Sequence, residues 1–309
     1  MTGDRVVTGH LVTRHFLDIT DFTADELRTI LSLAQQSALP HVLAGLGAAL
    51  IFEKPSNRTR QSMEMAVVQL GGHPVYTRGD EVGFDVREPV EDIVRVMAGY
   101  HAILAARVFS HDIVARMAAV SPVPVVNMLS DHSHPLQALA DVLTMQQVHG
   151  SIVGLSVAFV GYYNNVSRSL AEVCVMLGAN MALACPVGYH ADDAELERVN
   201  ALGPGAVTQV HRPAEAVVGA MAVHTDSWTS MGQEAEKHAR TRAFEGYTVD
   251  HEMMARAAPG AAFYHCLPAY RGLEVSADVI DGPASHVVAQ AHNRMHAARG
   301  ALAFLLGVR

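Results

Sequence analysis

Short apolar runs that end in polar turns recur along this chain and constrain its fold more than any other feature. The runs at 48–52, 102–106, 123–128 and 155–160 are each followed by polar residues and then by apolar residues at helical spacing. A run of four to eight apolar residues bounded by turn residues is typical of a buried strand. Strands that alternate with helices predict an α/β fold built on parallel sheets.

A fresh β-α-β unit begins after His149-Gly150, where the helical pattern that starts at Pro135 ends. A strand at 155–160, a helix at 166–178 and a strand at 179–185 follow, so we place a domain boundary near residue 150. The parallel pattern is expected to continue through 206–210, 214–219, 220–225 and, after a long polar loop, 262–266. A final helix is expected from about 289 to 306.

Composition favours a globular protein and narrows the choice of partners. Half of the 309 residues are apolar and 17% are charged, and the formal net charge is −9. This charge argues against a nucleic-acid or membrane-surface partner, because both are anionic. No apolar run approaches the roughly 18 residues of a membrane span, and the N-terminus lacks the apolar core of a secretory signal. A soluble cytoplasmic protein is expected.

The stretch 52–60, Phe-Glu-Lys-Pro-Ser-Asn-Arg-Thr-Arg, joins a predicted strand to a predicted helix and is interpreted as a phosphate cradle. Ser56 stands at the N-cap position, where unpaired backbone N–H groups and the helix dipole favour an anion. Arg58 and Arg60 add forked donors, and Ser56 and Thr59 add hydroxyls suited to a phosphoryl or carboxyl group. The alternative is an ordinary strand-to-helix turn with surface arginines.

Polar side chains follow several other predicted strands, at the edge where ligands collect in an open parallel sheet. Arg107 directly follows the strand 102–106 and is a second candidate for binding an anionic group. His134 and Gln137 share one helix face and could orient a carbonyl group, although His134 alone could be a capping or surface residue. Asn165 follows Gly161 at another helix N-terminus, without the G-x-G-x-x-G fingerprint of dinucleotide binding.

Two further polar clusters lie in the second half of the chain. Asp226 opens a polar loop and supplies a carboxylate that could bind an ammonium group. Cys266 ends a predicted strand, where it could accept or relay a proton, or could equally be a buried inert thiol. The three cysteines lack metal-ligand spacing and the 18 histidines form no zinc set, so no metal site is expected.

Taken together, these stretches resemble the carbamoyltransferase superfamily, and within it the ornithine carbamoyltransferases, over nearly the whole chain. Residues 56–60 look like the family's S-T-R-T-R loop, and Arg107, residues 134–137 and Asn293-Arg294 follow in the family's order. Aspartate carbamoyltransferases share much of that half. Asp226 with 230–232 is similar to the ornithine-binding loop, and 265–268 to the loop that closes over the amine.

The resemblance implies two similar-sized domains, each a parallel sheet flanked by helices, joined by long helices. Residues 1–149 and 290–309 would bind carbamoyl phosphate, and residues 150–289 would bind L-ornithine. It implies transfer of the carbamoyl group to the δ-amine, which gives L-citrulline and phosphate. It also implies no metal or organic cofactor and a homotrimer with active sites near the subunit interfaces.

The resemblance assigns residues to three roles. Carbamoyl phosphate would be bound by Ser56, Asn57, Arg58, Thr59, Arg107, His134, Gln137, Cys266, Leu267 and Arg294, with His134, Gln137 and Arg107 on the carbamoyl oxygen. Ornithine would be positioned by Asn165, Asp226, Ser230 and Met231. The chemical step would be served by Arg107, His134, Asp226 and Cys266, because an amine with a pKa of roughly 10.4 must lose a proton before it attacks.

Three departures from the family pattern lie close to these residues. Asn57 replaces a threonine of the phosphate loop, Tyr162-Tyr163 replaces small or acidic residues, and His292 stands where a glutamate commonly precedes Asn-Arg. They leave open a carbamoyltransferase for another amine, such as putrescine or an acylated ornithine. A catalytically silent binding or regulatory paralogue is the third interpretation, and a dehydrogenase a distant fourth.

Overall fold

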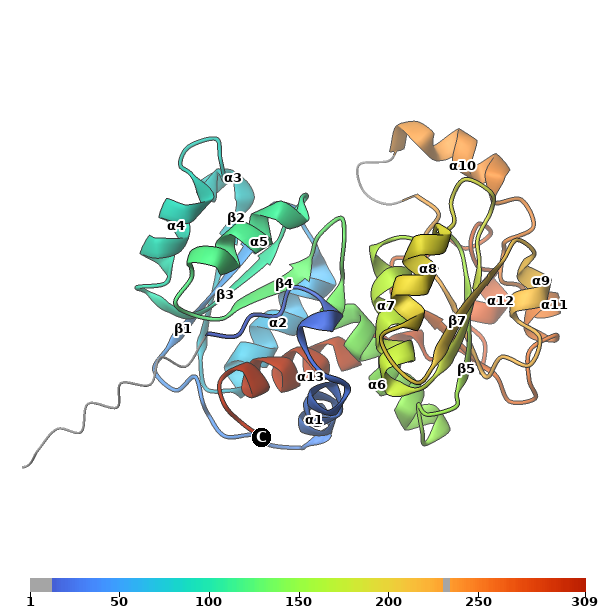
Figure 1. Cartoon of the computed structure of the whole chain (residues 1–309), viewed down its shortest axis with the longest axis horizontal. Coiled ribbons are helices and arrows are strands. Elements are labelled where there is room, and N and C mark those ends of the chain that lie inside the picture. The colour runs from blue at the N-terminus through green and yellow to red at the C-terminus, as the bar shows by residue number, and fades with distance from the viewer. Residues whose placement is uncertain (1–12, 230–233) are drawn as a thin grey trace, which may run out of the picture.

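Two parallel sheets organise the computed structural model, which describes residues 13–229 and 234–309 (Figure 1). The first has strand order β2-β1-β3-β4, with β1 (Gly47–Phe52), β2 (His73–Arg78), β3 (His101–Arg107) and β4 (Val125–Leu129). The second has order β7-β6-β5-β8-β9, with β5 (Ser156–Val160), β6 (Asn180–Ala184), β7 (Ala206–Val210), β8 (Ala222–Thr225) and β9 (Ala262–His265). The predicted α/β fold is confirmed.

Successive residues of a strand point to opposite sides, so the first sheet has two apolar faces. Helices cover both of them. Ala48 and Leu50 of β1 pack in a cluster that includes side chains of four helices next to this sheet, and Ala49 and Ile51 pack in another with side chains of two. The first four are α1 (Ala24–Gln35), α2 (Asn57–Gln69), α6 (Pro135–His149) and α13 (Val287–Leu305); the other two are α4 (Val90–Met97) and α5 (His111–Val120).

The second sheet is enclosed in the same way. Val157 and Phe159 of β5 belong to the cluster that includes α6 and α7 (Asn165–Leu177), whereas Ala158 and Val160 pack on the opposite side. The remaining helices of this half are α8 (Asp193–Asn200), α9 (Pro213–Ala216), α10 (Lys237–Ala243), α11 (His251–Met254) and α12 (Ala277–Ile280), with the 3-10 turn η2 (Glu234–Glu236).

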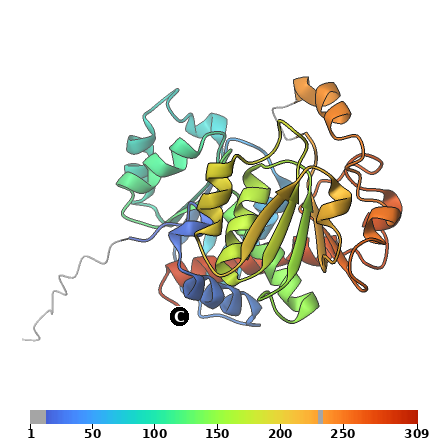
Figure 2. The same ribbon diagram turned by 45° about the vertical axis from the view of Figure 1, so that its right-hand side comes forward.

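Two long helices, α6 and α13, join the halves. Helix α6 leads from the first sheet into the second, and α13 starts beside β9 and packs against α1, α2 and α6. In both views α13 runs back along the first half and ends near the C-terminus, close to α1 (Figures 1 and 2). One continuous apolar cluster, from Phe16 to Phe304, therefore spans both sheets.

Local signals account for most of these boundaries. The predicted Ser56 N-cap is present, with its hydroxyl accepting a hydrogen bond from the Thr59 backbone N–H at 3.3 Å. Pro135 occupies the first turn of α6. The run 214–219 was expected to continue the strand pattern, but it holds α9, because Pro213 begins a helical turn there. The polar loop expected after Thr225 contains α10 and α11, and a further short helix, α3 (Gly79–Val82), follows β2.

Candidate active site

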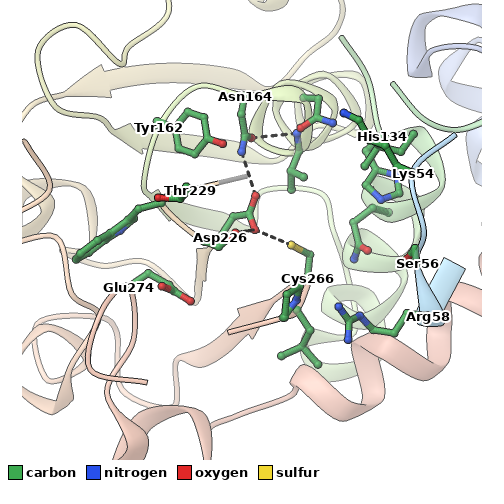
Figure 3. A pocket seen from close by; sticks show the side chains of 18 of the residues that line it. Lys54, Ser56, Arg58, His134, Tyr162, Asn164, Asp226, Thr229, Cys266 and Glu274 are labelled. Atoms are coloured by element: carbon green, nitrogen blue, oxygen red, sulfur yellow. Dashed lines mark hydrogen bonds between the residues drawn. The ribbon is translucent and has the colours of Figure 1, made fainter. Parts of the chain in front are cut away.

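A pocket of about 700 Å³ lies where the carboxyl ends of the two sheets face each other. Its lining comes from the segments that follow six strands: β1, β3 and β4 of the first sheet, and β5, β8 and β9 of the second. This is the edge at which open parallel sheets bind ligands. Figure 3 shows Ser56, Arg58 and His134 on one side, and Asn164, Asp226 and Glu274 on the other.

Three guanidinium groups converge on the first side of this pocket. Arg58 comes from the first turn of α2, Arg107 from the end of β3 and Arg294 from α13. Arg107 and Arg294 are buried, and both donate to Thr59 Oγ1, at 3.4 Å and 2.6 Å. Within the described residues, no carboxylate lies within ion-pair distance of any of the three, and their Nε atoms have no acceptor.

The pKa values of two of these guanidinium groups show how unfavourable the arrangement is without an anion. Burial, together with the charges of Arg294 and Arg58, lowers the pKa of Arg107 to about 9. Burial lowers the pKa of Arg294 to about 10. Buried like charges normally require a compensating partner. The cluster is therefore suited to a dianion, which would also meet the N-terminus of α2.

The two arginines of the phosphate-loop motif do not act together. Arg60 was expected to add a second forked donor, but it does not line the pocket. It pairs with Glu64 at 2.8 Å and lies over the Tyr76 ring. Residues i and i+2 of a helix point to different sides, which explains why only Arg58 faces inward. Asn57 lines the pocket but is exposed.

His134 stands at the N-cap of α6 and is buried beside the arginines. Burial, and then the charges of Arg294 and Arg107, hold its pKa well below the ordinary value of 6.5. The imidazole is therefore neutral at pH 7. Its backbone N–H donates to Ser169 Oγ at 3.0 Å, while Nδ1 has no partner among the described residues. A neutral imidazole in this place can donate to, or accept from, a ligand.

Gln137 lies in the first turn of α6 and contacts the arginine cluster directly. Its Oε1 accepts from Arg294 Nη1 at 2.9 Å, and its Nε2 donates to Asp141 Oδ1 at 2.7 Å. Because Nε2 is engaged by Asp141, the part of this amide that faces the arginines is its oxygen.

Asp226 and Cys266 form the centre of the opposite side. The thiol donates to Asp226 Oδ1 at 3.0 Å, and Asn164 Nδ2 donates to Asp226 Oδ2 at 3.0 Å (Figure 3). Burial, and then the adjacent carboxylate, raise the pKa of Cys266 well above its ordinary value. Cys266 is therefore a thiol that lines the pocket with Leu267, in contact with a carboxylate.

Asn165 points its side chain toward the first half of the protein. Its Nδ2 donates to the Ser130 backbone carbonyl at 2.7 Å, so it connects α7 to the segment after β4. Ser230 and Met231, which the sequence assigned to ornithine, lie outside the described residues.

Glu274 is a pocket residue that sequence reasoning missed. It is fully buried; its Oε1 lies 3.3 Å from His265 Nε2 and accepts from the Tyr270 backbone N–H at 2.5 Å. His265 Nδ1 accepts from the Leu267 backbone N–H at 2.8 Å. These bonds hold the loop that carries Cys266. Candidate metal-ligand atoms of Asp226, His265 and Cys266 lie within 4.8 Å of one another, but the hydrogen bonds above already engage all three side chains.

Other lining residues had been assigned no role from the sequence, among them Lys54, Asn164, Trp228 and Lys237. Lys54 could have been found, because it belongs to the phosphate-loop motif. Burial, and then the charge of Arg107, lower its pKa, and its ammonium group lies 4.5 Å from the centre of the Phe109 ring. Asn164 and Trp228 stand within two residues of Asn165 and Asp226, whereas Lys237 reaches the pocket only through the fold.

The two unusual tyrosines both line the pocket, whereas His292 is exposed and does not. Tyr163 donates to Glu195 at 2.7 Å, and burial followed by this carboxylate raises its pKa. The Tyr162 ring packs edge-on against Phe244 and under the Arg240 guanidinium. Both rings are therefore held by the second half of the protein.

Among the described residues, no helix is long and apolar enough to cross a membrane.

Comparisons with known proteins agree with this geometry. The profile described as aspartate/ornithine carbamoyltransferase, carbamoyl-P binding domain matches residues 14–147, and the profile of the Asp/Orn binding domain matches residues 153–305. Ornithine carbamoyltransferase of Thermus thermophilus is 44% identical over 95% of this chain and 97% of its own length. The solved structure of the Pyrococcus furiosus ornithine carbamoyltransferase has a TM-score of 0.91 at 40% identity, covering 97% of this chain and 99% of that one. The chain belongs to the aspartate/ornithine carbamoyltransferase family.

Proposed function

We propose that this protein transfers the carbamoyl group of carbamoyl phosphate to the δ-amine of L-ornithine, giving L-citrulline and phosphate. One observation carries the proposal: three guanidinium groups, which have no carboxylate partner among the described residues, face a carboxylate and a thiol across a single pocket. A dianionic donor suits the first group, and an amino acid with a cationic end suits the second. Relatives named ornithine carbamoyltransferase, at 42–44% identity, support this choice of amine.

The phosphate side of the reaction follows from the arginine cluster. Arg58, Arg107 and Arg294, with Ser56 and Thr59, would bind the phosphate and neutralise the charge that grows on it as it leaves. His134, which is neutral, would donate to the carbamoyl oxygen next to Arg107. Gln137 presents its amide oxygen, so it would accept from the carbamoyl amino group and would not contact the carbamoyl oxygen, as the resemblance had implied.

The amine side follows from Asp226. Its carboxylate would pair with the ammonium groups of ornithine and receive the proton that the δ-amine must lose before attack. Cys266 shares that carboxylate through its S–H, so it would tune the carboxylate rather than act as a thiolate base. The C–N bond to citrulline then forms as the C–O bond to phosphate breaks.

We assign residues 1–149 and 290–309 to the carbamoyl-phosphate domain and residues 150–289 to the ornithine domain. Packing of α13 against α1, α2 and α6 supports the return of the chain to the first domain. We further propose a homotrimer, supported by exposed apolar side chains on the first half at Leu46, Met65, Val68 and Tyr100. A cytoplasmic location is supported by three free cysteines.

An amine panel tests the function. The purified chain, at saturating carbamoyl phosphate, is expected to form citrulline from L-ornithine at a higher kcat/KM than it carbamoylates putrescine or N-acetylornithine. Sedimentation equilibrium is expected to give three times the chain mass of 33.1 kDa. Absence of citrulline with ornithine, while another amine is carbamoylated, would transfer the assignment to that amine.

A further inference from the structure

Asp141 lies one turn beyond Gln137 on α6, fully buried and behind the pocket lining. Its Oδ1 accepts from Gln137 Nε2 at 2.7 Å and from Gln290 Nε2 at 2.6 Å. Its Oδ2 lies 3.4 Å from His224 Nε2. One carboxylate therefore joins side chains from α6, α13 and β8.

Each amide in this cluster lies between a group that can only donate and the Asp141 carboxylate, which accepts from its NH2 group. Arg294 Nη1 donates to Gln137 Oε1, and the His265 backbone N–H donates to Gln290 Oε1 at 2.9 Å. Each amide must then turn its NH2 group toward Asp141. Two donors meet at one oxygen, so the position requires a strong acceptor, which a buried carboxylate provides.

The cluster lies directly behind both sides of the pocket. On the first side, Asp141 holds Gln137, which contacts Arg294. On the second side, Gln290 connects it to the backbone of His265, which precedes Cys266. The Asp141 side chain itself does not reach the pocket, so any effect on a ligand must pass through these amides.

We propose that Asp141 is a positioning residue that fixes the Gln137 amide with its oxygen toward the ligand, and thereby makes the pocket prefer carbamoyl phosphate to inorganic phosphate. The inference rests on the proposed function, because it takes carbamoyl phosphate as the ligand. Carbamoyl phosphate carries an amino group that an amide oxygen can accept from, and inorganic phosphate does not. With Asp141 in place, Gln137 cannot turn its NH2 group toward that amino group.

Electrostatics and positioning predict opposite effects when the Asp141 charge is removed. The carboxylate lies behind Arg294 and opposes its positive potential. Without that charge, both anions would bind more tightly if electrostatics alone mattered. Loss of the fixed amide weakens only carbamoyl phosphate, because only this ligand contacts Gln137. The ratio of the two dissociation constants separates the two effects.

The test uses the full chain with Asp141→Asn, and calorimetric titrations of freshly dissolved carbamoyl phosphate and of inorganic phosphate without amine. The preference for carbamoyl phosphate is expected to fall about fivefold or more, while the Kd for phosphate stays equal or decreases. An unchanged preference would overturn the inference. If Asp141→Asn does not fold, Asp141→Ser replaces it with the same expectation, since its hydroxyl is too short to reach both amides.

A double-mutant cycle with Gln137→Ala identifies the route of the effect. In that background Asp141→Asn is expected to cause no further fall in preference, and an equal fall would overturn the inference. Thr144→Val is the matched control: Thr144 Oγ1 accepts from Asn293 at 2.9 Å, so it joins the same two helices without touching Gln137. The Thr144→Val variant is expected to prefer carbamoyl phosphate to inorganic phosphate as strongly as the unaltered chain does. These experiments measure binding and not turnover. A chain that prefers carbamoyl phosphate but makes no citrulline would therefore contradict the proposed function and leave this inference standing.

Discussion

The thiol of Cys266 donates a hydrogen bond to Asp226 Oδ1 across 3.0 Å, which joins the end of β9 to the end of β8. A thiol that donates to a carboxylate cannot at the same time be a thiolate nucleophile or base. Burial, and then this contact with the Asp226 carboxylate, raise the pKa of Cys266 above its ordinary value.

Asp226→Asn is expected to lower the pKa of Cys266, because it removes the neighbouring negative charge while burial remains. The measurement is the rate of alkylation by iodoacetamide as a function of pH, with Cys266→Ser as the control for reaction at the other two cysteines, which are buried. The midpoint is expected to move to lower pH in the Asp226→Asn variant. A midpoint that does not move would contradict the assigned contact.

Cys266→Ser is expected to reduce kcat by about tenfold to a hundredfold, because it changes the group that shares the Asp226 carboxylate. The Kd for carbamoyl phosphate is expected to change less than about twofold, since the arginine cluster is untouched. Steady-state kinetics and direct titration separate the two quantities. A large loss of carbamoyl-phosphate affinity would place Cys266 on the phosphate side instead.

Arg107→Ala is expected to reduce turnover by about a thousandfold or more, because Arg107 is a buried charge aimed at the proposed dianion. Arg107→Lys is expected to recover only part of the rate, since an ammonium group lacks the planar fork of donors. Arg60→Ala is the control, because Arg60 belongs to the phosphate-loop motif but pairs with Glu64 outside the pocket. Equal losses at Arg107 and Arg60 would refute the placement of the anion.

Glu172→Gln tests a buried carboxyl group away from the pocket. Glu172 is fully buried next to Arg168 and Arg198, and burial followed by the charge of Asp18 raises its pKa from 4.5 to about 8. The folded state therefore binds more protons than the unfolded state between these pH values, so this group's contribution to stability falls as pH rises. The loss is on the order of 4 kcal/mol across that range.

In the Glu172→Gln variant this pH dependence is expected to disappear. Urea unfolding at pH 5 and pH 8.5 measures it, and the unaltered chain should lose more stability than the variant on going to the higher pH. A variant with the same pH dependence would show that another group titrates.

The fold could be predicted from the sequence where elements are long enough to show a period. β1, β3 and α13 were expected within three residues of their observed ends, because apolar spacing dictates which face is buried. Helices such as α9 and α11 have four residues, too few for a periodic signal. Their positions depend on packing that links distant parts of the chain.

The site was predictable where polar residues end strands. Arg107, His134, Asp226 and Cys266 follow strands, and all of them line the pocket. Asp141 and Glu274 were not found, because they act through contacts with residues that are neighbours only in space. Arg60 was interpreted wrongly because the motif was read as a string of charges, whereas a helix turns successive residues to different sides.

The most direct test is a crystal structure with a bisubstrate analogue that joins a phosphonate to ornithine through the δ-nitrogen. The phosphonate oxygens are expected within hydrogen-bond distance of Arg58, Arg107 and Arg294, with the α-ammonium group against Asp226. A phosphonate bound away from these guanidinium groups, or an amino-acid end away from Asp226, would contradict the account.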